Sequence, residues 1–219
     1  MRKNTIIFDL DGTLLNTLED LTDGVNHTLC QYGFPEKTRQ EVRRALGNGA
    51  RWLIRSSLPE EVPAPELDQV LKDYEAYYQE HCRIKTGPYD GILELLEDLK
   101  RRQVKMAIIS NKGDGAVREL NRQYFSEYIS TAQGVHEGIR RKPSPDAVLE
   151  ALKKLESSPK DAVYVGDTEV DYETAKNAGL DCVLVSWGFR DREQLKLLQP
   201  DLLIDTPQEL LRWLNCEVK

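Results

Sequence analysis

Short apolar runs alternate with amphipathic stretches through most of this chain, a pattern typical of a parallel α/β fold. Continuous apolar runs predict buried strands; they cover residues 5–10, 104–109, 162–165 and 182–185, with weaker candidates at 129–131 and 202–204. Apolar residues at helical spacing predict helices between these strands, over residues 92–99, 117–124 and 148–155, up to residue 178, and near Leu195 and Trp213.

The segment between residues 17 and 84 lacks this alternation, because every periodic pattern in it is helical. Glycine and proline breaks separate its predicted helices, at residues 18–29, 38–46, 50–58 and 65–81. The sequence therefore predicts an α/β core, a doubly wound, Rossmann-like parallel sheet built from residues 1–15 and 86–219. An all-helical insertion over residues 16–85 follows the first strand.

Composition narrows the class of protein. A chain of 219 residues can form one large domain, or one domain that carries a smaller one. Its 40% hydrophobic and 31% charged residues are typical of a soluble globular protein, and its net charge of -7 argues against nucleic-acid and membrane partners. No apolar run is long enough to span a membrane, and the scattered cysteines fit no disulfide framework, so we expect a cytoplasmic protein.

Carboxylates follow two of the predicted strands at the point where each strand ends. Asp9 and Asp11 close the first apolar run, and Asp167 closes the run at 162–165, with Asp171 one helical turn later. Ligands of open parallel sheets bind beyond the carboxyl ends of the strands, so we expect these side chains to meet. Neighbouring carboxylates need a cation or a proton between them, and Mg²⁺ suits such a pocket. The alternatives are a hairpin turn at the first site and a helix N-cap at the second.

Groups suited to binding phosphate follow other predicted elements. Ser110 and Asn111 end the strand at 104–109 and offer a hydroxyl, an amide and backbone donors. Lys142 lies just before a predicted helix, where a cation is unfavourable unless an anion faces both. Capping of a helix by Ser110 or Asn111, and a solvated surface position for Lys142, are the structural alternatives.

Together these residues suggest phosphoryl transfer. Asp9 is a candidate nucleophile toward phosphorus, forming an aspartyl-phosphate, while Mg²⁺ and Lys142 neutralise the phosphoryl oxygens. Asp11 is left to donate a proton to the leaving oxygen and to take a proton from the attacking water. One site would then serve both half-reactions.

Four short motifs occur in order along the chain: Asp9-Leu10-Asp11-Gly12-Thr13, Ser110-Asn111, Lys142-Pro143 and Gly166-Asp167 through Asp171. With them the chain resembles the haloacid dehalogenase-like superfamily of phosphohydrolases, whose helical cap the insertion also resembles. The second aspartate of the first motif is similar to that of the phosphatases and mutases, and the dehalogenases lack it.

The resemblance implies a role for each motif residue. It implies a nucleophilic Asp9 and an acid/base Asp11, with phosphate contacts from four residues: Thr13, Ser110, Asn111 and Lys142. It implies Mg²⁺ held by Asp9, by the backbone carbonyl of Asp11 and by Asp167. Gly166 and Asp171 would support the site, Asp171 by orienting Lys142 or a metal-bound water.

Two further segments look like phosphoglycolate phosphatases: the stretch from Leu46 to Arg51 and Ser186-Trp187-Gly188-Phe189. The first would place Asn48, Gly49 and Arg51 of the cap against substrate, although the glycines can also be a simple helix break. Asn16 and Asp90 depart from residues frequent in the family, without touching the chemistry.

The expected function is Mg²⁺-dependent hydrolysis of a small phosphorylated metabolite, with 2-phosphoglycolate as the leading substrate. A pyrophosphatase or nucleotide phosphatase is the main alternative, and a β-phosphoglucomutase-like phosphotransferase or a non-catalytic phosphate-ligand binder is less favoured. Phosphonate hydrolysis would need a Schiff-base lysine in the cap, for which Lys37, Lys72 and Lys85 are candidates. The protein is expected to be a monomer or a homodimer.

Overall fold

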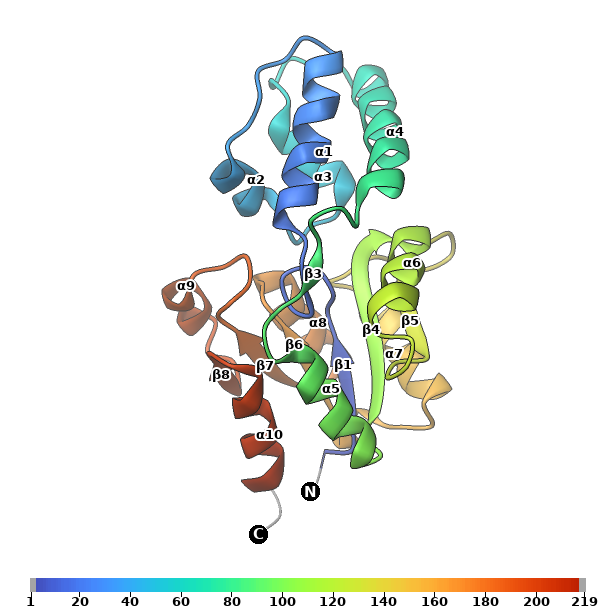
Figure 1. The fold of residues 1–219 in the computed structure, drawn as a ribbon, viewed down its shortest axis with the longest axis vertical. Helices are drawn as coiled ribbons and strands as arrows, with labels where there is room; N and C mark the ends of the chain where they lie inside the picture. Colours follow the sequence, from blue (N-terminus) through green and yellow to red (C-terminus); the bar gives the residue numbers. More distant parts are fainter. Residues whose placement is uncertain (1–2, 217–219) are drawn as a thin grey trace.

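Six parallel strands form the central sheet, in the order β5-β4-β1-β6-β7-β8 (Figure 1). The computed structural model describes residues 3–216. The strands are β1 (Thr5–Phe8), β4 (Lys105–Gly113), β5 (Thr131–Val135), β6 (Ala162–Gly166), β7 (Asp181–Val185) and β8 (Leu202–Ile204). The chain builds outward from β1 in one direction and then, from β6, in the other. The order therefore reverses between β1 and β6, and ligands bind at such a reversal.

Helices cover both faces of this sheet, which explains why the strands read as continuous apolar runs. In β1, Ile6 and Phe8 join one apolar cluster, and Ile7 joins the other. The first cluster includes residues from α5 (Ile92–Arg101), α6 (Asp114–Tyr124) and α10 (Pro207–Cys216). The second includes residues from α7 (Asp146–Lys154), α8 (Glu169–Ala178) and α9 (Arg192–Leu197). The predicted doubly wound α/β core is thus confirmed.

Four helices form a cap beyond the carboxyl ends of the strands (Figure 1). They are α1 (Leu18–Gln31), α2 (Arg39–Ala45), α3 (Ala50–Ser57) and α4 (Ala64–His81). The apolar stripe of α1 is buried, as is the facing stripe of α4, which carries Tyr74 and Tyr78. Thr38 and Glu41 form a capping box that fixes the start of α2. The helical insertion predicted from sequence is therefore present.

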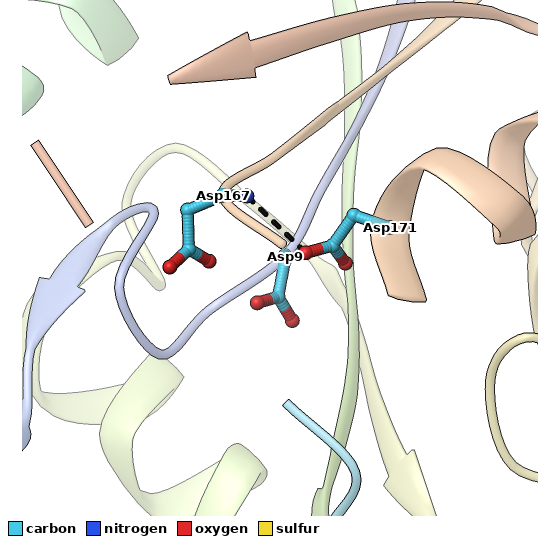
Figure 2. Close-up of side chains that lie close together, drawn as sticks. All are labelled: Asp9, Asp167 and Asp171. Atoms are coloured by element: carbon cyan, nitrogen blue, oxygen red, sulfur yellow. Dashed lines mark hydrogen bonds between the residues drawn. The ribbon is translucent and has the colours of Figure 1, made fainter. Parts of the chain in front are cut away.

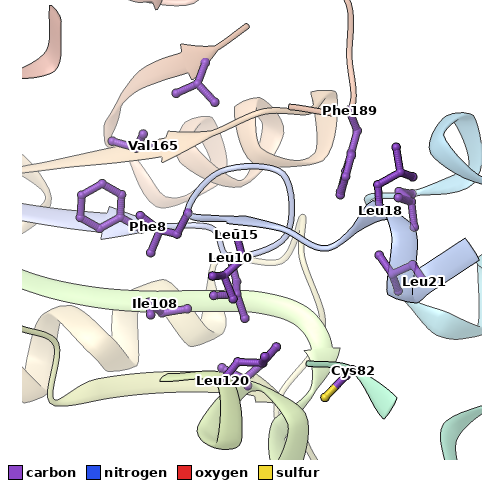
Figure 3. Close-up of a cluster of buried hydrophobic side chains, with 14 of the residues drawn as sticks. Phe8, Leu10, Leu15, Leu18, Leu21, Cys82, Ile108, Leu120, Val165 and Phe189 are labelled. Carbon is purple, nitrogen blue, oxygen red and sulfur yellow. The ribbon is translucent and has the colours of Figure 1, made fainter. Parts of the chain in front are cut away.

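The chain crosses between sheet and cap twice, and the two crossings lie side by side. β2 (Leu15–Asn16) pairs antiparallel with β3 (Gly87–Pro88). Apolar side chains continue from the sheet to the base of the cap, from Phe8 through Leu15 to Leu18 (Figure 3). The division of the chain into a core domain and a cap domain at residues 16 and 85 stays a prediction.

Two elements differ from the sequence-based expectation. The weak strand expected at 129–131 begins only at Thr131. Ile129 lies before it, buried in the segment after α6, where its N–H donates to the carbonyl of Phe125. The strand expected to end at Ile109 continues to Gly113, with an irregular register between these two residues. Such a bulge re-aims side chains at a strand end, and this one lies at the site described next.

Candidate active site

Side chains from several strand ends converge where the strand order reverses. Asp9 follows β1, Asp167 follows β6, and Asp171 lies in the first turn of α8 (Figure 2). One oxygen of each carboxylate lies within 4.8 Å of the others, and all three residues are buried. The structure therefore brings together the carboxylates that the strand ends predicted.

A backbone hydrogen bond positions Asp9, and the surroundings of its side chain determine its protonation. Its N–H donates to the carbonyl of Val165 at 2.8 Å, which extends the pairing of β1 with β6 past the last regular residue. The residue is only 6% exposed. Burial raises the pKa of Asp9 to about 7, against the opposing effect of the Lys142 ammonium. Asp9 is thus a carboxylate that a nearby positive charge must keep ionised.

Lys142 supplies one such charge. Its Nζ donates to Asp9 Oδ1 at 2.7 Å, to Asp171 Oδ1 at 2.8 Å and to the Tyr164 hydroxyl at 3.0 Å. Burial acts to lower the pKa of Lys142, but the two carboxylates outweigh it and raise that pKa well above its usual value. The solvated surface position considered for Lys142 is therefore wrong.

Asn111 holds Lys142 in position. Its amide accepts from the Lys142 N–H at 2.8 Å and donates to the Lys142 carbonyl at 3.1 Å, and it also donates to the carbonyl of Gly47 in the cap. Neither Ser110 nor Asn111 caps α6, whose N-cap is Gly113. Both residues line the cavity between core and cap, as does Asp9.

Asp171 and Asp167 have different surroundings. Asp171 Oδ2 accepts from the N–H and the hydroxyl of Thr168, at 3.0 and 2.8 Å, so Thr168 and not Asp167 is the N-cap of α8. Asp167 accepts from the Thr13 hydroxyl at 3.2 Å and from the Phe189 N–H at 2.7 Å. Burial and the charges of Asp171 and Asp9 raise the pKa of Asp167 well above its usual value.

These carboxylates fit a divalent cation. Asp9, Asp167 and Asp171 lie close together with one buried ammonium, which pairs with Asp9 and Asp171 and leaves an excess of two negative charges when all are ionised. The Lys142 ammonium neutralises Asp171, whose other oxygen accepts from Thr168, whereas Asp167 has only neutral donors, so Asp167 together with Asp9 is better placed to face an ion. A hard divalent cation with oxygen ligands would neutralise the excess. The contact expected from the Asp11 backbone carbonyl stays a prediction.

The Asp11 side chain pairs with Lys112, a residue that the sequence analysis did not assign to the site. Its Oδ1 pairs with Lys112 Nζ at 2.8 Å, and Lys112 also donates to the Tyr78 hydroxyl of the cap at 2.9 Å. The Lys112 side chain is 7% exposed. Its place directly after Ser110-Asn111 was the available signal, but a lysine on its own in a loop is usually solvated. Burial reveals it as part of the site.

A cavity of about 330 Å³ separates the core residues from the cap. The cap lines it with the loop residues Gly47 and Gly49, with side chains of α3, and with a row of α4 side chains that sequence reasoning missed: Tyr74, Glu75, Tyr78 and Gln79. The spacing of Tyr74 and Tyr78 on one helical face was the only signal for them. Both tyrosines line the same cavity as Asp9.

The predicted cap contacts are only partly at this cavity. Gly49 lines it, whereas neither Asn48 nor Arg51 belongs to its lining. Arg51 is exposed, and its guanidinium pairs with Asp68 at 2.6 Å. Within residues 3–216, none of the lysines considered for a Schiff base lines the cavity: Lys37, Lys72 and Lys85. Contact of Asn48 and Arg51 with substrate stays a prediction.

Comparison with known proteins agrees with this fold. The family model described as haloacid dehalogenase-like hydrolase matches residues 6–185. The chain belongs to this family. None of its helices within the described residues is both long and apolar enough to cross a membrane.

Individual relatives show which members of the family this chain is similar to. The chain is 34% identical to phosphoglycolate phosphatase 1 of Pseudomonas aeruginosa, over 94% of this chain and 78% of that protein. It is 28% identical to pyrophosphatase PpaX of Bacillus cereus, over 96% of each. A crystal structure from Lactobacillus delbrueckii subsp. bulgaricus, whose assignment as a phosphoglycolate phosphatase is itself an inference, aligns with a TM-score of 0.90 at 34% identity, covering 96% and 97% of the chains. The protein is therefore a phosphoglycolate phosphatase-like enzyme of the hydrolase family.

Gly188 tests how tightly this site is packed. A Cβ at Gly188 would lie 2.3 Å from Asp167 Oδ2 and 2.5 Å from the Gly12 carbonyl, so the carboxylate or the loop must move. We expect Gly188→Ala to lower the free energy of unfolding by about 1–3 kcal/mol, the usual cost of overpacking. Chemical denaturation measures this change.

Gly87→Ala is the matched control, because nothing lies within 4 Å of its added Cβ. Its effect should stay within about 0.5 kcal/mol. Equal effects of the two substitutions would contradict the close packing around Asp167.

Proposed function

We propose that the protein is a Mg²⁺-dependent phosphomonoester hydrolase that acts on 2-phosphoglycolate through an aspartyl-phosphate on Asp9. One observation carries the proposal: a buried Asp9 faces the cavity, with Lys142 at 2.7 Å and Asp167 nearby. A carboxylate so placed can attack phosphorus, while the ammonium lowers the charge on the phosphoryl oxygens. Mg²⁺ bound by Asp9 and Asp167 would add electrostatic stabilisation of the same oxygens.

Asp11 serves the proton transfers in this proposal. Its carboxyl lines the cavity near Asp9 and is held by Lys112 at 2.8 Å. In the first half-reaction Asp11 donates a proton to the leaving alkoxide as the bond between phosphorus and that oxygen breaks. In the second it takes a proton from water as water attacks the aspartyl-phosphate, which releases inorganic phosphate and restores Asp9. Asp9 and Asp11 therefore return to their starting states after each turnover.

Lys112 supports a substrate with a second negative group. In the part of the chain described, Lys142 and Lys112 are the only basic side chains that line the cavity. Lys142 is engaged by two carboxylates, whereas Lys112 is paired with one, Asp11. Lys112 lies next to the cap, where it donates to the Tyr78 hydroxyl. A carboxylate attached close to the phosphate, as in 2-phosphoglycolate, suits this position. The likeness to phosphoglycolate phosphatases supports the same substrate.

A pyrophosphatase is the second candidate, favoured by the likeness to PpaX. The second phosphoryl group of pyrophosphate would also be attracted to Lys112. Steady-state rates with Mg²⁺ on 2-phosphoglycolate, pyrophosphate, sugar phosphates and nucleotides separate the two. A higher kcat/KM for pyrophosphate than for 2-phosphoglycolate would overturn the proposed substrate and leave the shared chemistry intact.

Asp9→Asn tests the nucleophile. Because an amide cannot form the aspartyl-phosphate, turnover of 2-phosphoglycolate should fall by roughly 10³-fold or more. The variant should remain folded, because Asp171 still pairs with the Lys142 ammonium and the loss of one negative charge relieves repulsion within the acidic cluster. Phosphate release and thermal unfolding measure the two effects. A folded variant with unchanged turnover would exclude Asp9 as the nucleophile.

Metal binding should depend on pH. Because the pKa of Asp9 without metal is raised to about 7, Mg²⁺ must displace a proton from it below that pH. Apparent Mg²⁺ affinity should therefore weaken as pH falls from about 8 to about 6, by up to about tenfold per pH unit for each proton displaced. Titration calorimetry measures this dependence, with Asp181→Asn as a distant control. An affinity that does not change across this range would contradict the assignment of Asp9 as a ligand.

Lys112→Met tests the carboxylate contact. Loss of a charge-assisted hydrogen bond should lower kcat/KM for 2-phosphoglycolate by roughly tenfold more than for ethyl phosphate, which lacks the carboxylate. Lys112→Arg keeps the charge and should retain most of the preference. Equal losses on the two substrates would mean that Lys112 acts only through Asp11.

A further inference from the structure

The segment Ser186–Arg190, which follows β7, connects several parts of the active site; we call it the crossover segment. Its Trp187 Nε1 donates to the carbonyl of Thr13 at 3.0 Å. Its Phe189 N–H donates to Asp167 Oδ2 at 2.7 Å, and the Phe189 ring lies near Leu18 at the base of the cap (Figure 3). The crossover segment therefore contacts the nucleophile loop, a candidate metal carboxylate and the cap.

Its last residue, Arg190, reaches across to the cap. Its Nη2 donates to the carbonyl of Leu46 at 2.9 Å, and its Nη1 lies 3.4 Å from the carbonyl of Arg43. Leu46 is the C-cap of α2, where backbone carbonyls lack partners within the helix. A guanidinium there satisfies these carbonyls and complements the negative end of the helix dipole.

The contact is reciprocal. Arg43 of the cap donates from Nη2 to the carbonyl of Gly188 in the core at 3.1 Å, and its Nη1 pairs with Asp191 at 3.1 Å. Each side thus supplies an arginine to backbone carbonyls of the other. A backbone carbonyl cannot change its direction by changing rotamer, as a side chain can. These bonds therefore define the relative position of α2 and the crossover segment.

Glu169 fixes the Arg190 side chain. Both its oxygens accept from the guanidinium, at 2.7 Å each, in the bidentate geometry that orients arginine most firmly. Glu169 begins α8, two residues after Asp167. The Arg190 side chain is 13% exposed, so solvent screens the pair only partly. The same short stretch of chain therefore supports both the candidate metal carboxylate and the arginine that holds the cap.

The residues after Leu46 form the cap wall of the cavity. Gly47 and Gly49 line it, and the Gly47 carbonyl accepts from Asn111 at 3.1 Å. Movement of Leu46 would carry this loop away from Asn111, which also holds the backbone of Lys142. The start of the loop is thus held by two contacts with the core, at Leu46 through Arg190 and at Gly47 through Asn111.

We propose that Arg190 is a positioning residue that holds the Gly47–Gly49 loop of the cap over the active site, with Arg43 as its reciprocal partner. Arg190 touches no reacting group; it acts by fixing the end of α2. The proposal rests on the proposed function only in taking this cavity as the place of phosphate hydrolysis. It assigns a role to a pair of arginines that the four motifs do not include.

Hydrogen exchange of the purified full chain with and without Mg²⁺ tests the proposal. In Arg190→Met, amide exchange in residues 44–50 should become roughly tenfold faster, the loss expected for hydrogen bonds from a charged donor, with the sheet unchanged. Arg190→Lys should restore part of the protection, and Arg43→Met should show the same local effect. Arg192→Met is the control, since Arg192 pairs with Asp205 away from the cap.

Kinetics on 2-phosphoglycolate add a second readout. Loosening of the loop should raise KM by roughly tenfold in Arg190→Met with a smaller change in kcat, because the chemical groups stay in place. Arg190 borders a hollow of about 460 Å³, which gives a methionine side chain room and favours a folded variant. Should Arg190→Met not fold, Arg43→Met decides alone.

Unchanged exchange in residues 44–50 of both variants would overturn the proposal. So would faster exchange spread evenly over the sheet, which would mark a general structural role. If the unmodified protein hydrolyses no phosphomonoester, the proposed function fails, while the exchange data still decide whether Arg190 holds the loop.

Discussion

The buried ammonium of Lys142 is the interaction on which the rest of the site depends. It lies between Asp9 and Asp171, and without it the carboxylates at this edge of the sheet would repel one another in a medium that screens charge poorly. Removing one partner of such a buried pair costs about 3–5 kcal/mol, because the remaining charge is left uncompensated. One ammonium does not neutralise three carboxylates. The remaining negative charge suits the site to a divalent cation.

The topology of the sheet makes this concentration of charge possible. β1 and β6 are buried on both faces, so neither strand can carry a charged side chain along its length. Charge is tolerated only where each strand ends, and parallel strands end at the same edge. The backbone pairing of β1 with β6 continues through the N–H of Asp9, which brings Asp9 level with the loop of Asp167. Apolar strands therefore determine where the polar groups meet.

This division also explains what could be predicted from the sequence. Asp9 and Asp167 could be predicted because each follows an apolar run where a strand ends, and Lys142 because it lies just before a predicted helix, where a cation is unfavourable. Lys112 and Arg190 were not assigned, since their roles come from partners far away in the chain, Asp11 and Leu46. A surface loop and a buried loop with the same residues look alike in one sequence. Only the packing of the cap on the core distinguishes them.

Chemistry and selectivity come from different parts of the cavity wall, and the boundary between them runs through residues that contact both parts. Asn111 bonds to Lys142 on the core side and to Gly47 on the cap side. Lys112 does the same with Asp11 and Tyr78. A change in the cap can therefore alter which leaving group fits without moving Asp9. The chain is similar over most of its length to relatives named for phosphoglycolate and for pyrophosphate, and a common core beneath a variable cap would account for both names.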